Sequence, residues 1–301
     1  MSSTQMVELD AYNLARFAQS VPCYVCDGPN KPEAELCRHC FAPMALGHQA
    51  KSSKVKPQMI AAIGSSGVGK TVFLGVLMDM ISRRSRGMQA LARGAFSINL
   101  QQKTLAALQT GEFPEKTPAE PDRWNWVHCQ VKTQNSSRPI DLIMPDMAGE
   151  ALLEEIDQPS TYKVVRSFLS RCSGVMVLID SMRLSGGTAD QDYFTMKLLT
   201  YLAELETEDG KGWRKRPVAV VFSKADQCDD AFEDPTEFAK RRATGLWQHC
   251  EEEFKRHKFF AASATGTCAF RDTIEGRIQV PLRVEPRGIT EPFEWLIREL
   301  K

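Results

Sequence analysis

The arrangement of hydrophobic and polar positions changes at about residue 58. From there on, short apolar runs alternate with longer stretches in which apolar residues recur every three or four positions. The short runs are typical of strands in a sheet covered on both faces, and the longer stretches predict helices. The predicted strands are 59–63, 123–133, 140–144, 174–180, 217–223 and 258–264, and the predicted helices are 69–84, 97–111, 192–206, 234–254 and 289–300.

Two of the predicted helices carry recognisable start signals. Asp234 and Glu237 form an Asp-x-x-Glu start, and Pro292 falls in the first turn of the last helix. The alternation of strands and helices predicts an open α/β sheet that is mainly parallel. Because ligands of such sheets lie at the carboxyl ends of the strands, the residues that follow each strand are the first candidates for a site.

The first 57 residues have a different character. Residues 1–20 are polar and amphipathic and predict a short helix within 5–20. Residues 21–45 hold four clustered cysteines among turn-forming residues, which indicates a small module. Residues 46–57 are small and polar and predict a linker. Residues 58–301 then form the main domain.

Composition excludes several classes of protein. The 301 residues suffice for one large domain and a small module, and Lys+Arg and Asp+Glu balance at 38 each. This balance gives no general argument for nucleic acid or an anionic membrane as partner. The sequence shows neither a secretory leader nor an apolar run long enough to span a bilayer. Five of the nine cysteines are scattered, which fits a reducing compartment, so a cytoplasmic location is expected.

The segment after the first predicted strand matches the pattern G-x-x-x-x-G-K-[ST]. Its glycines let successive backbone N–H groups turn inward toward phosphate oxygens, and the following helix adds its positive N-terminal end. Lys70 would reach the β- and γ-phosphates, and the Thr71 hydroxyl would hold Mg²⁺. The alternative is a chance glycine-rich turn. The segment consists of Gly64, Ser65, Ser66, Gly67, Val68, Gly69, Lys70 and Thr71.

Asp146 and Gly149 follow the strand at 140–144 in the pattern D-x-x-G. An aspartate at this strand end can hold Mg²⁺ through water. A glycine there can turn its N–H toward the γ-phosphate and lose that bond on hydrolysis. The pattern is common after strands, and it gains weight from its place after the glycine loop.

Two further loops suit a purine base. Ser223, Lys224 and Asp226 follow the most apolar strand, and a carboxylate there can accept from both N1–H and the 2-amino group of guanine. Adenine offers no such pair of donors. The Lys224 stem can lie over the base plane. A turn at Ser263 and Ala264 can bring a backbone N–H to the guanine carbonyl. Alternatively, both are ordinary polar loops.

Together these motifs resemble, in order, those of Ras-like P-loop GTPases of the translation-factor-related (TRAFAC) class. The resemblance covers about residues 58–300 and implies a P-loop NTPase three-layer α/β sandwich with a mainly parallel sheet. The segments "DMAGE" and "GITEPFEWLI" are similar to bacterial stand-alone and paired GTPase domains. The resemblance implies GTP and GDP as ligands. It assigns phosphate binding to Gly64–Thr71 and Val72, switch II to Asp146 and Gly149, and base binding to Ser223, Lys224, Asp226, Ser263 and Ala264.

Three positions depart from the family pattern. Ser223 stands where the family has Asn or Thr, Thr265 where it has Lys, and Glu150 where many members have a water-orienting Gln. Because a glutamate can orient water only as an acceptor, we expect slow intrinsic hydrolysis. The implied catalytic residues are Lys70, Thr117, Gly149 and Glu150.

The switch I threonine should lie between the first helix and the strand at 123–133. The proline-rich segment 108–124 has no periodicity and fills this interval. Thr117 is the preferred candidate and Thr110 the second, while a plain loop hydroxyl is the alternative for either. Thr71, Thr117 and Asp146 thus form the expected Mg²⁺ set. Arg123 and Arg138 lie nearby, but neither is assigned as an arginine finger.

The N-terminal cysteines are Cys23, Cys26, Cys37 and Cys40. Two C-x-x-C knuckles present four thiolates in the tetrahedral arrangement that Zn²⁺ accepts. Since all four positions are cysteine, the site should be structural, and the pattern resembles a zinc ribbon. His39 is expected at the surface. A redox pair or free thiols are the alternatives.

The leading hypothesis is a protein that hydrolyses GTP to GDP and phosphate and acts as a nucleotide-dependent switch. A protein partner would recognise one nucleotide state, and the zinc ribbon would serve protein contact. A homo- or heterodimer with another GTPase domain is compatible with this hypothesis, and nucleic acid is not expected as partner. The alternatives are a hydrolysis-poor adaptor with the same fold and, less favoured, an ATPase or kinase.

Overall fold

A computed structural model describes the chain except for residues 1–19, 53–55, 135–137, 187–188, 274–275 and 301. The helix predicted within 5–20 therefore lies outside the described residues. Within the described part of the chain, every helix is too short or too polar to cross a bilayer.

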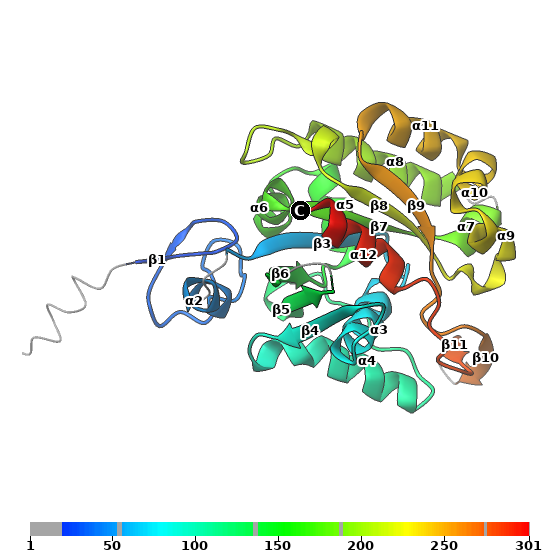
Figure 1. The fold of residues 1–301 in the computed structure, drawn as a ribbon, viewed down its shortest axis with the longest axis horizontal. Coiled ribbons are helices and arrows are strands. Elements are labelled where there is room, and N and C mark those ends of the chain that lie inside the picture. The colour runs from blue at the N-terminus through cyan, green and yellow to red at the C-terminus, as the bar shows by residue number, and fades with distance from the viewer. Residues whose placement is uncertain (1–19, 53–55, 135–137, 187–188, 274–275, 301) are drawn as a thin grey trace, which may run out of the picture.

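A seven-stranded sheet in the order β4-β5-β6-β3-β7-β8-β9 forms the centre of the molecule (Figure 1). The pairs from β6 to β9 are parallel, and β4–β5 and β5–β6 are antiparallel. The mainly parallel α/β sheet predicted from the sequence is thus confirmed. Its strands are β3 (Gln58–Gly64), β4 (Met88–Ala92), β5 (Trp126–Thr133), β6 (Ile140–Pro145), β7 (Gly174–Asp180), β8 (Val218–Ser223) and β9 (His257–Ala261).

The antiparallel edge was not predicted, and β4 was missed altogether. The connection between β5 and β6, residues 134–139, is too short for the crossover that a parallel pair requires. The two strands therefore pair as neighbours in opposite directions.

Helices cover both faces of the sheet. Side chains of β3 alternate between two buried clusters, with Ile60 and Ala62 in one and Ala61 and Ile63 in the other. The first cluster lies under α3 (Lys70–Ser82), α4 (Asn99–Gln109) and α12 (Thr290–Glu299). The second lies under α5 (Gly149–Asp157), α6 (Lys163–Arg171), α8 (Ala189–Glu204), α10 (Pro235–Arg242) and α11 (Thr244–Glu253). Shorter helices are η1 (Ala95–Ile98), η2 (Pro121–Arg123), α7 (Ser181–Ser185), η3 (Trp213–Lys215), η4 (Ala225–Gln227) and α9 (Asp229–Glu233).

The helix predicted over 234–254 is two helices. The Asp234 carboxylate caps α10 by accepting from the N–H groups of Thr236 (2.9 Å) and Glu237 (3.1 Å), as its Asp-x-x-Glu start indicated. Ala243 then adopts an extended φ of −145°, which ends α10 before α11 begins.

The N-terminal module contains β1 (Val21–Pro22), β2 (Pro29–Asn30) and α2 (Ala45–Ser52). The prediction of a linker over 46–57 is wrong for its first half, because α2 occupies it. Leu46 of this helix is fully buried, and Gln49 Oε1 lies 2.7 Å from Nδ1 of His128 in β5. Tertiary packing therefore stabilises a helix in a segment whose small polar residues suggested none.

Another unpredicted element is the hairpin of β10 (Cys268–Thr273) and β11 (Gly276–Pro281). It follows β9 and forms its own two-stranded sheet, separate from the central one (Figure 1). Its two strands are short, and their alternation was not recognised in the sequence.

Candidate functional site

The carboxyl ends of β3, β6, β8 and β9 meet at one edge of the sheet, as their parallel pairing requires. The loops that follow them surround a cavity of about 340 Å³. The motif residues that line it are Ser66, Gly67, Val68, Gly69, Lys70, Thr71, Val72, Thr117, Gly149, Glu150, Ser223, Lys224, Asp226, Ser263 and Ala264. The structure thus brings together segments far apart in the sequence.

The phosphate loop runs from the end of β3 into α3. Gly69 precedes α3 with φ 93° and ψ 22°, a left-handed conformation that glycine adopts without strain. Lys70 Nζ donates to the carbonyls of Gly64 and Ser65, both at 2.9 Å. Burial lowers the pKa of Lys70 to about 8, and the negative charges of Asp146 and Glu150 act in the opposite direction. The ammonium is therefore a charged group held inside the loop at neutral pH.

Three oxygen-bearing side chains converge beside the phosphate loop. Thr71 Oγ1 donates to one oxygen of the Asp146 carboxylate (3.3 Å), and Thr117 Oγ1 donates to the other (2.9 Å). The two hydroxyl oxygens lie 2.9 Å apart. Burial raises the pKa of Asp146, and the hydrogen bond from Thr117 opposes that rise.

This set fits Mg²⁺. Octahedral Mg²⁺ holds oxygen ligands at 2.0–2.1 Å, which places adjacent oxygens about 3 Å apart. The hydroxyl oxygens of Thr71 and Thr117 have this separation, and each hydroxyl donates a hydrogen bond to the Asp146 carboxylate.

Thr110, the second switch I candidate, and the two arginines considered as arginine fingers lie elsewhere. Thr110 is exposed at the end of α4, where its hydroxyl donates to the carbonyl of Ala107 (2.8 Å). Arg123 and Arg138 are exposed, and neither lines the cavity. The segment that carries Thr117 is the one that reaches the phosphate loop.

Gly149 opens α5 directly against the phosphate loop. A Cβ atom on Gly149 would lie 2.5 Å from the backbone N of Ser66 and 2.7 Å from the carbonyl carbon of Ser65. Such distances are shorter than any van der Waals contact, so only glycine permits this approach. The D-x-x-G segment and the phosphate loop therefore approach each other through backbone atoms.

Glu150 forms an ion pair with Lys116, the residue before Thr117. Partial burial would raise the pKa of Glu150, but hydrogen bonds from Lys116 and Ser66 outweigh it and lower the pKa below its usual value. Glu150 is therefore ionised and joins the switch I segment to the start of α5.

At the other end of the cavity, Asp226 is held by Ser263. The Ser263 hydroxyl donates to Asp226 Oδ1 at 2.6 Å and accepts from the N–H of Gly266 at 3.0 Å. The Ser263 N–H donates to the carbonyl of Arg287 (2.8 Å), which leaves the N–H of Ala264 as the candidate donor to a base.

The remaining two base-motif residues tie neighbouring loops together. Ser223 Oγ donates to the carbonyl of Val68 at 2.9 Å, with the carbonyl of Ile179 at 3.1 Å. Lys224 Nζ pairs with Asp180 at 2.7 Å. Asp180 also caps α7, so its carboxylate fixes the Lys224 side chain along the cavity wall. The shorter Ser223 side chain still reaches the phosphate loop.

Sequence reasoning missed several residues at this site. Asp180 ends β7, and its position at a strand end was the signal available for it. Lys116 lines the cavity beside Thr117, and Cys268 and Gln279 line it from the β10–β11 hairpin. Gly276 between two short alternating runs was the sequence signal for that hairpin.

The four N-terminal cysteines form a second centre. Their Sγ atoms all lie within 4.8 Å of one another, with Cys23 to Cys40 and Cys26 to Cys37 both at 3.6 Å. Tetrahedral Zn²⁺ with Zn–S bonds of about 2.3 Å places its sulfurs about 3.8 Å apart, so the cluster fits this ion. Hydrogen bonding from the Cys40 thiol lowers the pKa of Cys23 to about 5.

The two knuckles have matching backbones. The N–H of Val25 donates to Cys23 Sγ (3.3 Å), and the N–H of His39 donates to Cys37 Sγ (3.4 Å). These donors favour thiolates, which are the forms that bind zinc. The His39 side chain is exposed, as expected, and stays outside the cluster.

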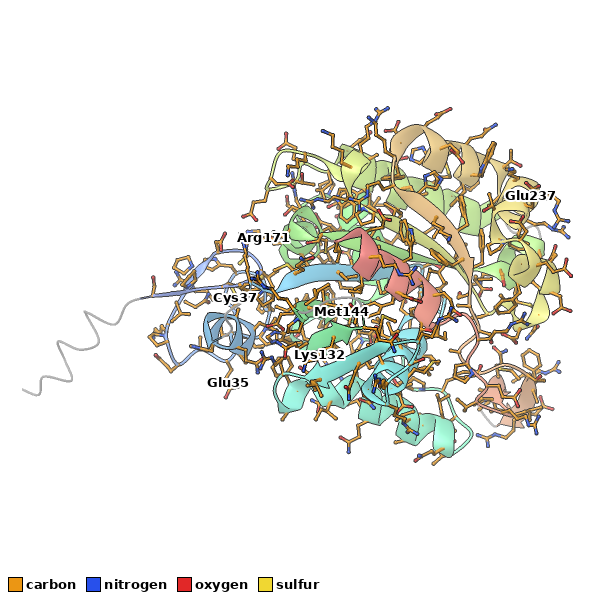
Figure 2. All side chains as sticks on the ribbon, in the orientation of Figure 1. Glu35, Cys37, Lys132, Met144, Arg171 and Glu237 are labelled. Carbon is orange, nitrogen blue, oxygen red and sulfur yellow. The ribbon has the colours of Figure 1, made fainter. Side chains whose placement is uncertain are left out.

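The cysteine module is packed onto the main domain. Val25 and Met44 belong to the same buried cluster as Trp126 and Phe168 of the domain. Arg171 at the end of α6 donates to the carbonyl of Tyr24 (2.8 Å) and forms ion pairs with Asp27 and Glu208. Figure 2 shows Arg171 and Cys37 on either side of this junction. The module and the domain share one core.

A larger cavity of about 640 Å³ lies at this junction, at the amino ends of β3, β7 and β8. It is remote from the motif residues. Its arginines pair with neighbouring carboxylates, as Arg216 does with Asp209 (2.9 Å) and Arg256 with Glu299 (2.6 Å). The size of a cavity therefore does not identify the nucleotide site here, whereas the converging motifs do.

The strand order, the phosphate loop after β3 and the loops at the ends of β6, β8 and β9 define a P-loop GTPase-type domain that binds GTP. The family model for Double-GTPase 2 matches residues 58–273, and the chain belongs to this family. The resemblance to Ras-like GTPases is thereby confirmed.

Solved structures with a similar fold include the small GTPase Arl6 (BBS3) of Trypanosoma brucei with bound GppNp, at 12% identity. That match covers 81% of this chain and 97% of that one, with a TM-score of 0.42. A protein of Plasmodium falciparum described as nucleolar GTP-binding protein 1 matches at 14% identity, over 82% and 89% of the two chains, with a TM-score of 0.40. A comparison with curated proteins found no match.

Proposed function

We propose that the protein is a nucleotide-dependent switch that binds GTP with Mg²⁺ and hydrolyses it slowly to GDP and phosphate. The main support for this proposal is the set of hydrogen bonds that joins the side chains of Thr71, Thr117 and Asp146 beside the phosphate loop. A switch requires its mobile loop to sense the phosphates, and Thr117 is the side chain through which that loop reaches them.

The phosphate end supplies the means of stabilising negative charge. Backbone N–H groups of the loop, the Lys70 ammonium and the N–H of Gly149 would stabilise the negative charge of a bound γ-phosphate. Thr71, Thr117 and Asp146 would hold Mg²⁺, which would supply positive charge to neutralise the phosphates. The backbone contact of Gly149 with Ser66 supports a role for this glycine in sensing the γ-phosphate.

The base end favours guanine. The Asp226 carboxylate is fixed by Ser263, so it can accept from N1–H and the 2-amino group of guanine without reorganising. Adenine lacks this pair of donors and would leave the carboxylate unsatisfied. The Ala264 N–H suits the guanine carbonyl.

We further propose that a protein partner recognises one nucleotide state, with the cysteine module holding structural Zn²⁺ and contributing to that contact. The balanced charge of the chain supports protein rather than nucleic acid as partner. The five cysteines outside the cluster are free thiols, which supports a cytoplasmic location. A second GTPase domain, of this chain or another, would fit as partner because such domains act across shared interfaces.

A hydrolysis-poor adaptor is the second candidate, and the presence of Glu150 where many family members have a water-orienting glutamine favours it. In this alternative, GTP binding alone orders the switch segments. A multiple-turnover measurement of phosphate release separates the two candidates, since an adaptor releases at most one phosphate per chain.

The test of base specificity is the binding of fluorescent GDP, GTP and ATP analogues with Mg²⁺. We expect guanine nucleotides to bind and ATP not to compete. Asp226→Asn should shift preference toward xanthine nucleotides, because the amide can donate where the carboxylate only accepts. Equal competition by ATP, or binding of no nucleotide while zinc is retained, would overturn the proposal.

A further inference from the structure

We propose that Lys116 is a catalytic cation that this chain supplies to the γ-phosphate from its own switch I segment, and that Glu150 is its positioning residue. This inference rests on the proposed GTPase function. Among the residues that the structure describes, no arginine lines the nucleotide cavity, and Lys116 would supply the positive charge there.

The position of Lys116 is set by its neighbour. Thr117 is fixed to the phosphate loop and to Asp146 by hydrogen bonds of 2.9 Å each, and Lys116 precedes it. The Lys116 side chain consequently lines the nucleotide cavity at its phosphate end.

Glu150 reaches Lys116 from a different segment of the cavity lining. It lies in the first turn of α5, next to Gly149, whose backbone contacts Ser65 and Ser66. Glu150 also accepts a hydrogen bond from Ser66 of the phosphate loop. The ion pair with Lys116 therefore spans the phosphate end, with one partner from each switch segment.

The other cations of the cavity have different tasks. Among the described residues that line it, the cationic side chains are Lys70, Lys116 and Lys224. Lys70 is buried within the phosphate loop, and Lys224 pairs with Asp180 at the base end. Of these three lysines, Lys116 is the exposed one, and it lies beside the site of the γ-phosphate. Its side chain can therefore move toward the negative charge that develops in the transition state.

In the reaction, the oxygen of a water molecule forms a bond to the γ-phosphorus, and the bond from that phosphorus to the bridging oxygen breaks. GDP leaves with the electron pair, and the proton of the water passes to the released phosphate. Negative charge grows on the bridging oxygen during this step, so a cation at this end stabilises the transition state more than the ground state.

The pair also explains how Glu150 is compatible with catalysis. An unpaired carboxylate beside a triphosphate would repel it. Pairing with Lys116 neutralises that charge, and the carboxylate in turn holds the ammonium over the cavity. The two residues act as a unit, so neither functions fully without the other.

The test compares Lys116→Gln, Lys116→Arg, Glu150→Gln and the double variant with the wild type at saturating GTP and Mg²⁺. Phosphate release gives kcat and KM, and a fluorescent GDP analogue gives nucleotide affinity. Lys240→Gln serves as control, because Lys240 forms a similar exposed pair with Glu237 and does not line the cavity.

We expect Lys116→Gln to lower kcat by on the order of 10²-fold, less than the 10³–10⁵ of a full arginine finger. GDP affinity should stay within about threefold, because GDP has no γ-phosphate for the Lys116 ammonium to stabilise. Lys116→Arg should retain most of the rate, and Glu150→Gln should lower kcat as well. The double variant should match Lys116→Gln, because the pair acts as a unit.

A wild-type rate no higher than that of Lys116→Gln overturns this inference. So does a rise in kcat for Glu150→Gln with Lys116→Gln unchanged, which would make residue 150 a water-orienting group independent of Lys116. Failure of the wild type to bind guanine nucleotides overturns the proposed function instead, so the two failures are distinguishable.

Discussion

The hydroxyl of Ser263 donates to the Asp226 carboxylate at 2.6 Å and so joins the loops that follow β9 and β8. Through this bond, the loop after β9 orients the Asp226 carboxylate. A carboxylate fixed in this way meets guanine without losing rotational freedom on binding.

Ser263→Ala is therefore expected to weaken guanine nucleotide binding at least about tenfold. Hydrogen bonds to charged groups contribute about 1.5–3 kcal/mol, and 1.4 kcal/mol corresponds to a factor of ten. Titration with a fluorescent GDP analogue measures the change. Thr244→Ala is a suitable control, because its hydroxyl donates to the Lys240 carbonyl (2.6 Å) outside the cavity. Equal affinities for Ser263→Ala and the wild type would contradict the role given to this bond.

Thr117→Ala should weaken binding of a GTP analogue with Mg²⁺ by about tenfold and leave GDP binding nearly unchanged. The Thr117 hydroxyl is one of the oxygens that the Mg²⁺ set provides, and its loss removes one ligand only when the switch segment is closed. Calorimetric titration with each nucleotide measures both affinities.

Thr110→Ala is the matched control for Thr117→Ala. The Thr110 hydroxyl donates to the carbonyls of Ala106 and Ala107 at the end of α4, away from the cavity. The affinities of Thr110→Ala for GDP and for the GTP analogue should therefore stay at the wild-type level. A loss of GTP-analogue binding in Thr110→Ala with none in Thr117→Ala would reverse the assignment.

Gly149→Ala should weaken GTP-analogue binding about tenfold or more with little effect on GDP. The added methyl would overlap the backbone of Ser66 at 2.5 Å, and overpacking typically costs about 1–3 kcal/mol. This overlap would prevent α5 from closing against the phosphate loop. Gly245→Ala is the control, since it lies in α11 with nothing within 4 Å of an added Cβ, and alanine there should raise stability slightly.

Cys37→Ser should abolish zinc binding and lower the thermal midpoint of the whole chain by about 5–10 °C. The module shares a buried cluster with the domain, so loss of the metal exposes part of that core. In a domain of this size, 1 kcal/mol shifts the midpoint by about 2–4 °C. Metal analysis and a thermal melt measure the two effects. Cys268→Ser, outside the cluster, should keep one zinc ion per chain. A melting curve unchanged by loss of zinc would show that the module is not part of the shared core.

Much of the fold and of the site was predictable from local patterns. The phosphate loop is contiguous, so Gly64–Thr71 identify it without reference to the rest of the chain. The apolar runs before Asp146, Ser223 and Ser263 indicated parallel strands. Because parallel strands end at a common edge, the positions of those runs were enough to predict that the motif residues lie together.

The remaining features depended on contacts between distant segments. The aperiodic segment 108–124 allowed a preference for Thr117 over Thr110 but did not fix it, because a loop has no repeating pattern that determines which side chain points inward. The bonds from Thr117 to Asp146 and the pairing of Lys116 with Glu150 exist only in the folded chain.

The sequence by itself determined the class of domain, the phosphate loop, the base-binding motifs and the four-cysteine cluster, since each is encoded by short spacings or by strand periodicity. The tertiary structure alone decided the antiparallel edge, the helix over Ala45–Ser52 and the convergence of residues 113–117 and 147–150 on the cavity. The helix over Ala45–Ser52 depends on burial of Leu46 and on the contact of Gln49 with His128. Such contacts join residues whose separation along the chain carries no local signal, and their free energy appears only when the core forms.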